Sequence, residues 1–505
     1  MILALVLAAA AAPPKGRLVV VAVIDQLRYQ DLLWLAPEFG PRGFAGMGRP
    51  AAMRYDTVVT ETAADHAVLA TGAYADLNGV IGNRIYPEGV ARESVEDPAC
   101  PVWGAPGLGR SAAMLRIPTV GDALKLSSNG AARVVAVAGK DRSALFTAGP
   151  SGDLAIWFEQ ETGEMVSTTC YAPAPPQWLP QHVAAEWKDW VWTMSRPDAV
   201  SRLATRSETP MPRDGMGGDF PHRVGLGAVD KRLYHALRFS PPVSTLAVRT
   251  ARAAWKGMAL GEGATTDLLF IALSSVDTVG HQFGTLARER VDAVLRVHEE
   301  LGAFLDELRA RLGARLSVVL TSDHGLTPME SDEKRLKVAQ GGTIDIDALT
   351  QKINRALDEQ IGLRGEGWVA GIDGSALFLK PPYPPRAVQI AVELLRKEPG
   401  LWKVVPADEI DGAESFVRHA WFPGRSGQAL LVLRPLWTLK KAADGADHGS
   451  PWNDDALVPL AVQAQGFRLR RNEIFRATQV APAIAALLDI APPAAALDTP
   501  AIEHE

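Results

Sequence analysis

Six aspartate and histidine residues have the types and spacing of a metal site. They are Asp25, Asp277, His281, Asp323, His324 and His448. Asp277 and His281 stand four residues apart, so one turn of helix would place both side chains on the same face. Carboxylate and imidazole groups together suit zinc, and two groups of three would bind two ions. The set therefore predicts a two-metal centre.

Each part of this set also has a simpler interpretation. Asp277 and His281 could form only an ion pair on a helix. Asp323 and His324 could belong to a turn, and Asp25 could cap a helix. The combination favours the metal site, because three of the parts directly follow predicted strands.

Thr62 is the candidate nucleophile. It stands at an apparent helix start within residues 60–67, where Thr62 and Asp65 also fit a capping box. A threonine hydroxyl is a poor nucleophile unless a base or a metal activates it. Beside zinc and at a helix N-terminus, Thr62 would be activated by the metal, and free backbone N–H groups would face an anion.

Asn83, Lys140 and Arg142 could supply the other contacts to that anion. Arginine binds phosphate with two parallel hydrogen bonds, and lysine adds a point charge. The alternative for Lys140 and Arg142 is a charged surface turn.

The elements that must position these residues are four short apolar runs. They are Leu18 to Ile24, Val134 to Ala138, Leu268 to Leu273 and Leu316 to Leu320. Such runs are typical of strands buried on both faces of a parallel sheet. One long helix is predicted by an apolar face comprising Val291, Val294, Leu295, Leu301, Leu305, Leu308 and Leu312. The alternation predicts an α/β sandwich with a mostly parallel central sheet and helices on both faces, which binds ligands outside the carboxyl ends of its strands.

Two stretches interrupt this alternation. Residues 151–260 are rich in Trp and Pro, and we expect a cap-like insertion there. Residues 333–447 carry their own helix and strand signals and predict an inserted small α+β subdomain. The catalytic α/β domain then comprises residues 13–332 and 448–505.

Composition limits the choice of partners. Hydrophobic residues make up 47% and charged residues 22%, which is ordinary globular composition. Lys+Arg number 52 and Asp+Glu 58, giving a formal charge of −6. No global positive field exists to recruit nucleic acid or an anionic membrane, so we expect neither partner.

The N-terminus carries a targeting signal. Residues 2–12 are apolar and end in small residues, which predicts a signal peptide over residues 1–12 that is too short to span a bilayer. No other apolar run is long enough to span, so we expect no membrane span and a periplasmic or secreted protein. Cys100 and Cys170 could pair there, although the sequence does not show whether their geometry allows it.

Seven motifs in order resemble the alkaline phosphatase superfamily, and are most similar to single-chain bacterial phosphate-irrepressible alkaline phosphatases with a threonine nucleophile. The resemblance runs from about Val19 to about Ile490. The motifs are Val23-Ile24-Asp25-Gln26-Leu27-Arg28, Thr62 to His66, Gly79-Val80-Ile81-Gly82-Asn83, Gly139-Lys140-Asp141-Arg142-Ser143, Asp277 to His281, Asp323-His324-Gly325 and His448-Gly449-Ser450-Pro451.

The resemblance implies two zinc ions and a role for each residue. One zinc is assigned to Asp277, His281 and His448. The other is assigned to Asp25, Asp323, His324 and the Thr62 oxygen. Asn83, Lys140 and Arg142 are placed on the phosphoryl oxygens. Asp65 stands where we expect glycine in the family, and a carboxylate near Thr62 would weaken the binding of a dianion.

The resulting hypothesis is an exported zinc-dependent hydrolase of small phosphate monoesters, acting as a monomer through a phosphothreonine. The alternative is a phosphodiesterase or nucleotide pyrophosphatase of the same superfamily, which usually lacks the Lys140 and Arg142 pair. A catalytically dead metal-binding protein is a further alternative, although no ligand is lost. A sulfatase is discounted, because Cys100-Pro101-Val102 does not match the Cys-x-Pro-x-Arg segment that it needs.

Overall fold

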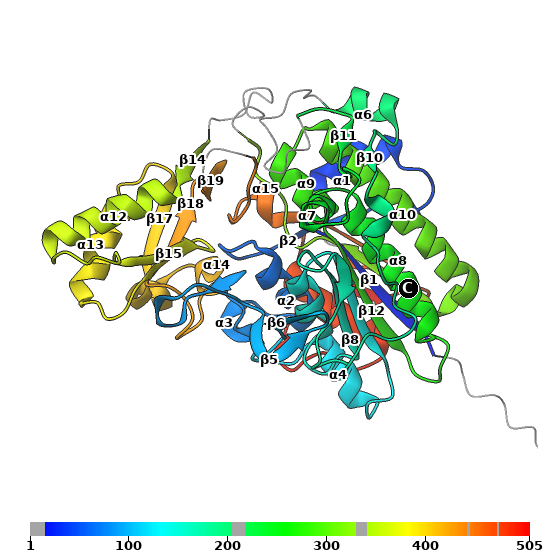
Figure 1. Ribbon diagram of the computed structural model, residues 1–505. Coiled ribbons are helices and arrows are strands. Elements are labelled where there is room, and N and C mark those ends of the chain that lie inside the picture. The colour runs from blue at the N-terminus through cyan, green and yellow to red at the C-terminus, as the bar shows by residue number, and fades with distance from the viewer. Residues whose placement is uncertain (1–15, 205–217, 330–340, 442–444, 472–473) are drawn as a thin grey trace, which may run out of the picture.

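The computed structural model describes residues 16–204, 218–329, 341–441, 445–471 and 474–505 (Figure 1). The predicted signal peptide, residues 1–12, lies outside the described residues. Among the described residues, no helix is long and apolar enough to cross a membrane.

A nine-stranded sheet forms the centre of the molecule. Its order is β22 (Ile474–Arg476), β2 (Ala51–Arg54), β20 (Leu457–Gln463), β13 (Leu316–Thr321), β1 (Leu18–Ile24), β12 (Asp267–Leu273), β7 (Val134–Ala138), β8 (Leu154–Glu159) and β9 (Glu164–Val166). The strands from β13 to β8 run parallel, and β20 and β9 are antiparallel to their neighbours. The four predicted strands are thus β13, β1, β12 and β7, side by side and buried throughout. Their carboxyl ends meet at one edge, which confirms the predicted fold class.

Two groups of helices pack against this sheet. One group comprises α8 (Pro242–Gly257), α9 (Ser275–Phe283) and α10 (Arg288–Leu312), and the other comprises α2 (Thr62–Thr71), α4 (Val120–Ser127), α5 (Asp141–Ala148) and α16 (Val480–Leu488). The predicted long helix is α10, and all seven of its expected apolar positions are buried. The two groups and the sheet form the layers of the sandwich.

Residues 341–441 build a second sheet, seen at the left of Figure 1. Its antiparallel order is β15 (Val369–Asp373), β16 (Ala376–Leu379), β18 (Ala429–Leu433) and β17 (Leu401–Pro406). Leu377 and Leu431 face α12 (Ile346–Gln360) and α13 (Pro385–Leu395) in one core. Because strand side chains alternate between faces, Phe378 and Leu430 point the other way, and they pack with Ala64 of α2. This packing holds the insertion against the start of α2.

The stretch expected to form a cap, residues 151–260, differs from that expectation. It supplies β8 and β9 to the central sheet, and α8 packs on β12, β7 and β8. The run Leu154–Glu159 is as short and as buried as the other core strands, although it lies beside the Trp-rich part. Outside the sheet lie β10 (Val191–Trp192), β11 (His222–Arg223), α6 (Pro197–Leu203) and α7 (Lys231–Arg238). The part of residues 151–260 that lies outside the central sheet and its helices is therefore shorter than the expected cap.

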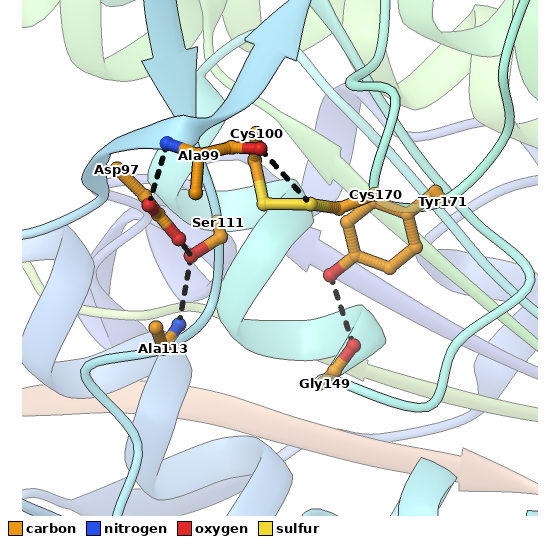
Figure 2. Close-up of a disulfide and its surroundings, with 8 residues drawn as sticks. All are labelled: Asp97, Ala99, Cys100, Ser111, Ala113, Gly149, Cys170 and Tyr171. Atoms are coloured by element: carbon orange, nitrogen blue, oxygen red, sulfur yellow. Dashed lines mark hydrogen bonds between the residues drawn. A yellow bond between two sulfur atoms is a disulfide. The ribbon is translucent and has the colours of Figure 1, made fainter.

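A disulfide joins Cys100 of β5 (Glu96–Val102) to Cys170, with a Cα–Cα distance of 5.3 Å (Figure 2). The adjacent Tyr171 hydroxyl donates a hydrogen bond of 2.9 Å to the carbonyl of Gly149, which ends α5. The pairing that the sequence left open is thus geometrically allowed, and it tethers the chain beside the helix that begins at Asp141.

Candidate active site

The carboxyl ends of the parallel strands carry the predicted chemistry. Asp25 directly follows β1, and Asp323 and Lys140 stand two residues after the ends of β13 and β7. Asp277 lies in the first turn of α9, directly after β12. Because these strands are neighbours in register, side chains that are hundreds of residues apart in sequence meet at one place.

Asp277 lies at the centre of three imidazoles. Its Oδ1 atom is 3.5 Å from His281 Nε2, 3.8 Å from His324 Nε2 and 4.0 Å from His448 Nε2. Asp277, His324 and His448 place one ligand atom each within 4.8 Å of one another, and so do His281, Asp447 and His448.

A second group combines Asp25 and Asp323 with His66. Asp25 Oδ1 is 3.7 Å from His66 Nε2, and Asp323 Oδ2 is 3.5 Å from His66 Nδ1. Asp323 Oδ2 also lies 3.4 Å from His324 Nε2. His324 therefore stands between the two groups, next to ligands of both.

The hydrogen bonds of the four histidines define which ring nitrogen is free. In each case Nδ1 lies within hydrogen-bonding distance of a backbone carbonyl, which only accepts. The pairs are His281 with Ala446 (3.0 Å), His324 with Gly325 (3.0 Å), His448 with Thr60 (2.7 Å) and His66 with Thr62 (2.8 Å). Nδ1 must therefore carry a proton, which leaves Nε2 as the ring nitrogen that could bind a metal. Such a backbone contact fixes the ring orientation of a metal ligand.

Several ligand atoms have no hydrogen-bond partner among the described residues. They are Asp25 Oδ1, Asp323 Oδ2, His66 Nε2 and His324 Nε2, all of them buried. Buried polar atoms normally have a hydrogen-bond partner, and a site for an ion explains why these do not. Oxygen and imidazole nitrogen are donors that zinc accepts in a catalytic site. The residues present therefore fit a zinc pair.

The electrostatics of the site favour an ionised Asp277 and a neutral His448. Burial raises the pKa of Asp277, but the charges of Lys140 and His281 outweigh burial and hold that pKa well below 3.8. Burial and the neighbouring imidazoles lower the pKa of His448 well below 6.5, so its ring is neutral. Burial lowers the pKa of His281, but Asp277 outweighs it and raises that pKa to about 9, so a metal would have to displace a proton from this ring.

Thr62 is the first residue of α2 and is bonded to Lys140. The Lys140 ammonium donates a hydrogen bond of 3.1 Å to Thr62 Oγ1. The same ammonium lies 2.7 Å from Asp277 Oδ2 and 3.3 Å from Asp25 Oδ2. Lys140 thus connects the candidate nucleophile with both ligand groups. The capping box considered for Thr62 is absent, since Glu61 is the N-cap.

Asn83 is held beside the start of α2 by two hydrogen bonds. The Ala63 N–H donates to Asn83 Oδ1 at 3.1 Å, and the Asn83 N–H donates to Glu61 Oε2 at 2.7 Å. The Asn83 side-chain amide nitrogen therefore remains available to an anion, on the wall of a pocket that also exposes Thr62. Arg142, in the first turn of α5, lines the same pocket.

This pocket has a volume of about 830 Å³ and opens between the two parts of the molecule. Thr62, Asp277, His281 and His448 form one side of it. Residues 346–350 and 370–375 of the insertion form its other side. The pocket is much larger than a phosphate ion, so it has room for the group that the phosphate is attached to.

Asp65 is placed differently from the expectation. It is fully buried in the first turn of α2, and its carboxyl oxygens have no hydrogen-bond partner among the described residues. Burial and the charges of Asp323 and Glu61 raise its pKa well above 3.8, which favours the neutral acid. Asp65 does not line the described pocket. It is therefore not positioned to repel a dianion there.

Four residues of the site were not predicted from the sequence: Gln26, Glu61, His66 and Asp447. Gln26 has φ of 67°, its N–H donates to Asp323 Oδ1 at 3.0 Å, and its side chain donates to Asp277 Oδ1 at 3.4 Å. The Arg290 guanidinium donates to the Gln26 carbonyl at 2.9 Å and to Asp31 at 2.7 Å. Gln26 thus orients one carboxylate of each ligand group. A signal existed for His66, because it follows Thr62 by one helical turn.

Comparison with known proteins identifies the family and the fold. The family model described as type I phosphodiesterase / nucleotide pyrophosphatase matches residues 19–451. The chain is 29% identical to alkaline phosphatase PhoK of Sphingomonas sp, over 97% of this chain and 91% of that protein. It is 26% identical to alkaline phosphatase PafA of Elizabethkingia meningoseptica, over 97% and 95%. The crystal structure of wild-type PafA superposes with a TM-score of 0.87 at 24% identity, over 97% of this chain and 99% of that one.

Proposed function

The chain belongs to the type I phosphodiesterase / nucleotide pyrophosphatase family of the alkaline phosphatase superfamily, and on that premise we propose that it is an exported zinc-dependent phosphate monoester hydrolase with Thr62 as its nucleophile. The named relatives PhoK and PafA are alkaline phosphatases, and this chain is a phosphatase of the same superfamily. The metal, the nucleophile and the export are the parts that we propose.

Two zinc ions would be held by the residues at the strand ends. Asp277, His281 and His448 would hold one, and the other would be held by Asp25, Asp323, His324 and the Thr62 oxygen. When bound, such a pair supplies Lewis acidity that lowers the pKa of a coordinated hydroxyl and stabilises negative charge on a leaving oxygen.

The chain's own residues then bind and orient the phosphoryl group. Arg142 and the Asn83 amide donate hydrogen bonds to its non-bridging oxygens, as do the backbone N–H groups at the start of α2. Lys140 donates to Thr62 Oγ1, which favours the deprotonated oxygen because a cation beside a hydroxyl stabilises its anion.

The proposed reaction proceeds in two steps. Thr62 Oγ1 forms a bond to phosphorus while the ester P–O bond breaks, and the leaving alcohol takes up a proton. Water then attacks the phosphothreonine and releases inorganic phosphate, and Thr62 recovers its hydroxyl proton. The two steps use the same preorganised donors for charge on the transferring group.

The single observation that carries this proposal is the position of Lys140. Its ammonium contacts Thr62 and both ligand carboxylates, Asp25 and Asp277. A lysine that only made the surface polar would be exposed to solvent. The burial of Lys140 among these groups instead supports a role beside the nucleophile and the metal ligands.

Metal analysis of purified active enzyme tests the metal part. We expect about two zinc ions per chain, and loss of para-nitrophenyl phosphate hydrolysis on chelation followed by recovery with added zinc. Active enzyme that contains no transition metal would contradict the proposal. Full zinc occupancy without turnover of any phosphate ester would instead favour a catalytically inactive metal-binding protein.

A phosphodiesterase is the second candidate, and the description of the matching family model favours it. Lys140 and Arg142 argue for monoesters, because a monoester dianion has one more charged oxygen for them to bind than a diester has. Comparison of bis-para-nitrophenyl phosphate with para-nitrophenyl phosphate on one preparation separates the two candidates.

Export is supported by the disulfide. Cys100 and Cys170 lie in bonding geometry, and disulfides persist mainly in oxidising compartments such as the periplasm. Detection of the mature N-terminus after residue 12 in a periplasmic or culture fraction would support the proposal, and an intact N-terminus on cytosolic protein would contradict it.

A further inference from the structure

Arg238 is a cation in the active-site pocket that the proposed reaction does not use. It is the last residue of α7, is half-buried, and lines the same pocket as Thr62 and Arg142. Among the described residues, its guanidinium makes no hydrogen bond or ion pair. A guanidinium has five N–H donors, and leaving them unused in a partly buried place is costly unless a ligand takes them.

Arg238 lies near two other arginines that share the carboxylate of Asp141. Asp141 lies among three arginines: Arg110 binds it at 3.0 Å and Arg142 lies at 3.7 Å, while Arg238 adds a third positive charge nearby. Burial and the charge of Arg142 lower the pKa of the Arg238 guanidinium more than Asp141, Glu159 and Asp277 raise it. Arg142 and Arg238 both line the pocket, so an anion bound there would give Arg238 the hydrogen-bond partner that Asp141, already paired with Arg110, does not provide.

The phosphoryl group that reacts does not account for this charge. Lys140, Arg142 and Asn83 already supply cationic and amide donors for its oxygens, next to Thr62. Arg238 comes from a different segment, the α7 helix, and reaches the pocket beside His235 and Phe239. The pocket's volume of about 830 Å³ leaves room for a further group beyond the reacting phosphate.

Resting on the proposed function, we propose that Arg238 forms a second anion subsite beside Arg142, which binds a phosphoryl group next to the scissile one. The favoured substrates are then condensed phosphates, such as nucleoside diphosphates, whose terminal phosphate is transferred to Thr62 while the adjacent phosphate is held by Arg238. The bond between the terminal phosphorus and the bridging oxygen breaks as Thr62 Oγ1 bonds to that phosphorus. The nucleoside monophosphate leaves, and its former bridging oxygen takes up a proton.

A pair of substrates that differ by one phosphate tests this subsite. ADP and AMP share base and ribose, so the ratio of their kcat/KM values isolates the added phosphoryl group. The change Arg238→Met should lower the ratio of kcat/KM for ADP to kcat/KM for AMP by about tenfold or more. Hydrogen bonds to a charged group are roughly twice as strong as those between neutral groups, and this variant loses them. Arg238→Lys, which keeps the charge but loses the planar fork, should give an intermediate ratio.

Lys231→Met is the matched control. Lys231 is exposed at the other end of α7 and pairs with Glu161 at 2.7 Å, so its loss changes the net charge equally without touching the pocket. We expect an unchanged ADP/AMP ratio in this variant. An unchanged ratio in Arg238→Met, or an equal loss on both substrates, would overturn the subsite, and the position of Arg238 would then reflect only a favourable contact with the C-terminal end of its helix. Wild-type enzyme that hydrolyses no phosphate ester would instead contradict the proposed function.

Discussion

The ammonium of Lys140 donates a 3.1 Å hydrogen bond to the hydroxyl of Thr62. The two residues are 78 positions apart, and they meet because Lys140 follows β7 while Thr62 begins α2, which packs on α5. The same ammonium contacts Asp25 and Asp277. The Lys140 ammonium therefore joins the candidate nucleophile Thr62 to the two candidate ligand carboxylates at one buried place.

Replacing Lys140 and Arg142 together by alanine tests the preference for monoesters. Each contact to a charged phosphoryl oxygen is worth ~1.5–3 kcal/mol, so monoester kcat/KM should fall on the order of a hundredfold or more. Diester turnover should fall much less, because a diester has one charged oxygen fewer. Equal losses on both substrates would mean that the pair does not discriminate, and the phosphodiesterase would become the better candidate.

Acid stability should depend on Asp31, which supports the Gln26 turn through Arg290. Burial raises the pKa of Asp31, but Arg28 and Arg290 outweigh burial and lower it to about 2. A lowered pKa stabilises the fold above the ordinary value of 3.8, and this contribution is lost as the pH falls through about 2.

The corresponding measurement is urea unfolding of metal-free protein at pH 5, 4, 3 and 2. Between pH 5 and 2 the wild type should lose about 2 kcal/mol more than Asp31→Asn, which cannot titrate. Asp56→Asn changes a carboxylate whose side chain is 41% exposed, and it should follow the wild type. Parallel pH profiles for wild type and Asp31→Asn would show that the Asp31 network does not stabilise the fold.

The disulfide should contribute to stability rather than to chemistry. It closes a loop between residues 70 positions apart, and a crosslink of that span constrains the unfolded chain by about 4 kcal/mol in the chain-entropy model. Cys100→Ser with Cys170→Ser should therefore lower the free energy of unfolding, while kcat for para-nitrophenyl phosphate at 25 °C changes little. Loss of kcat in a folded double variant would show instead that the crosslink positions α5 and its phosphate-binding residues.

Much of the fold follows from the sequence because its signals are local. Leu18–Ile24 and Val134–Ala138 are uninterrupted apolar runs of strand length, and both strands have those bounds. The stripe from Val291 to Leu312 likewise has the period of α10. The cap was misjudged because Leu154–Glu159 carries the same kind of run, while the tryptophans around it dominate the composition.

The site was predictable only in part, because some of its residues act through tertiary contacts. Asp277 and His281 are recognisable from helical spacing alone. Gln26 is not, since its role comes from a left-handed backbone and from carboxylates about 250 and 300 positions away. Arg238 lies on a helix with ordinary amphipathic spacing, and only the folded chain brings it to the pocket. Asp65 was expected to affect a bound anion because it follows Thr62 closely in sequence. Its carboxyl group does not line the pocket, so that expectation was wrong.

Trapping the phosphoryl-enzyme tests the central claim most directly. Enzyme mixed with a radiolabelled phosphate monoester and quenched in acid should carry phosphate on the peptide that contains Thr62. Thr62→Ala should retain about two zinc ions, form no labelled protein and lose nearly all turnover, while Thr62→Ser should retain a phosphorylatable hydroxyl and measurable turnover. Label on any other residue, or near wild-type turnover by Thr62→Ala, would contradict the account.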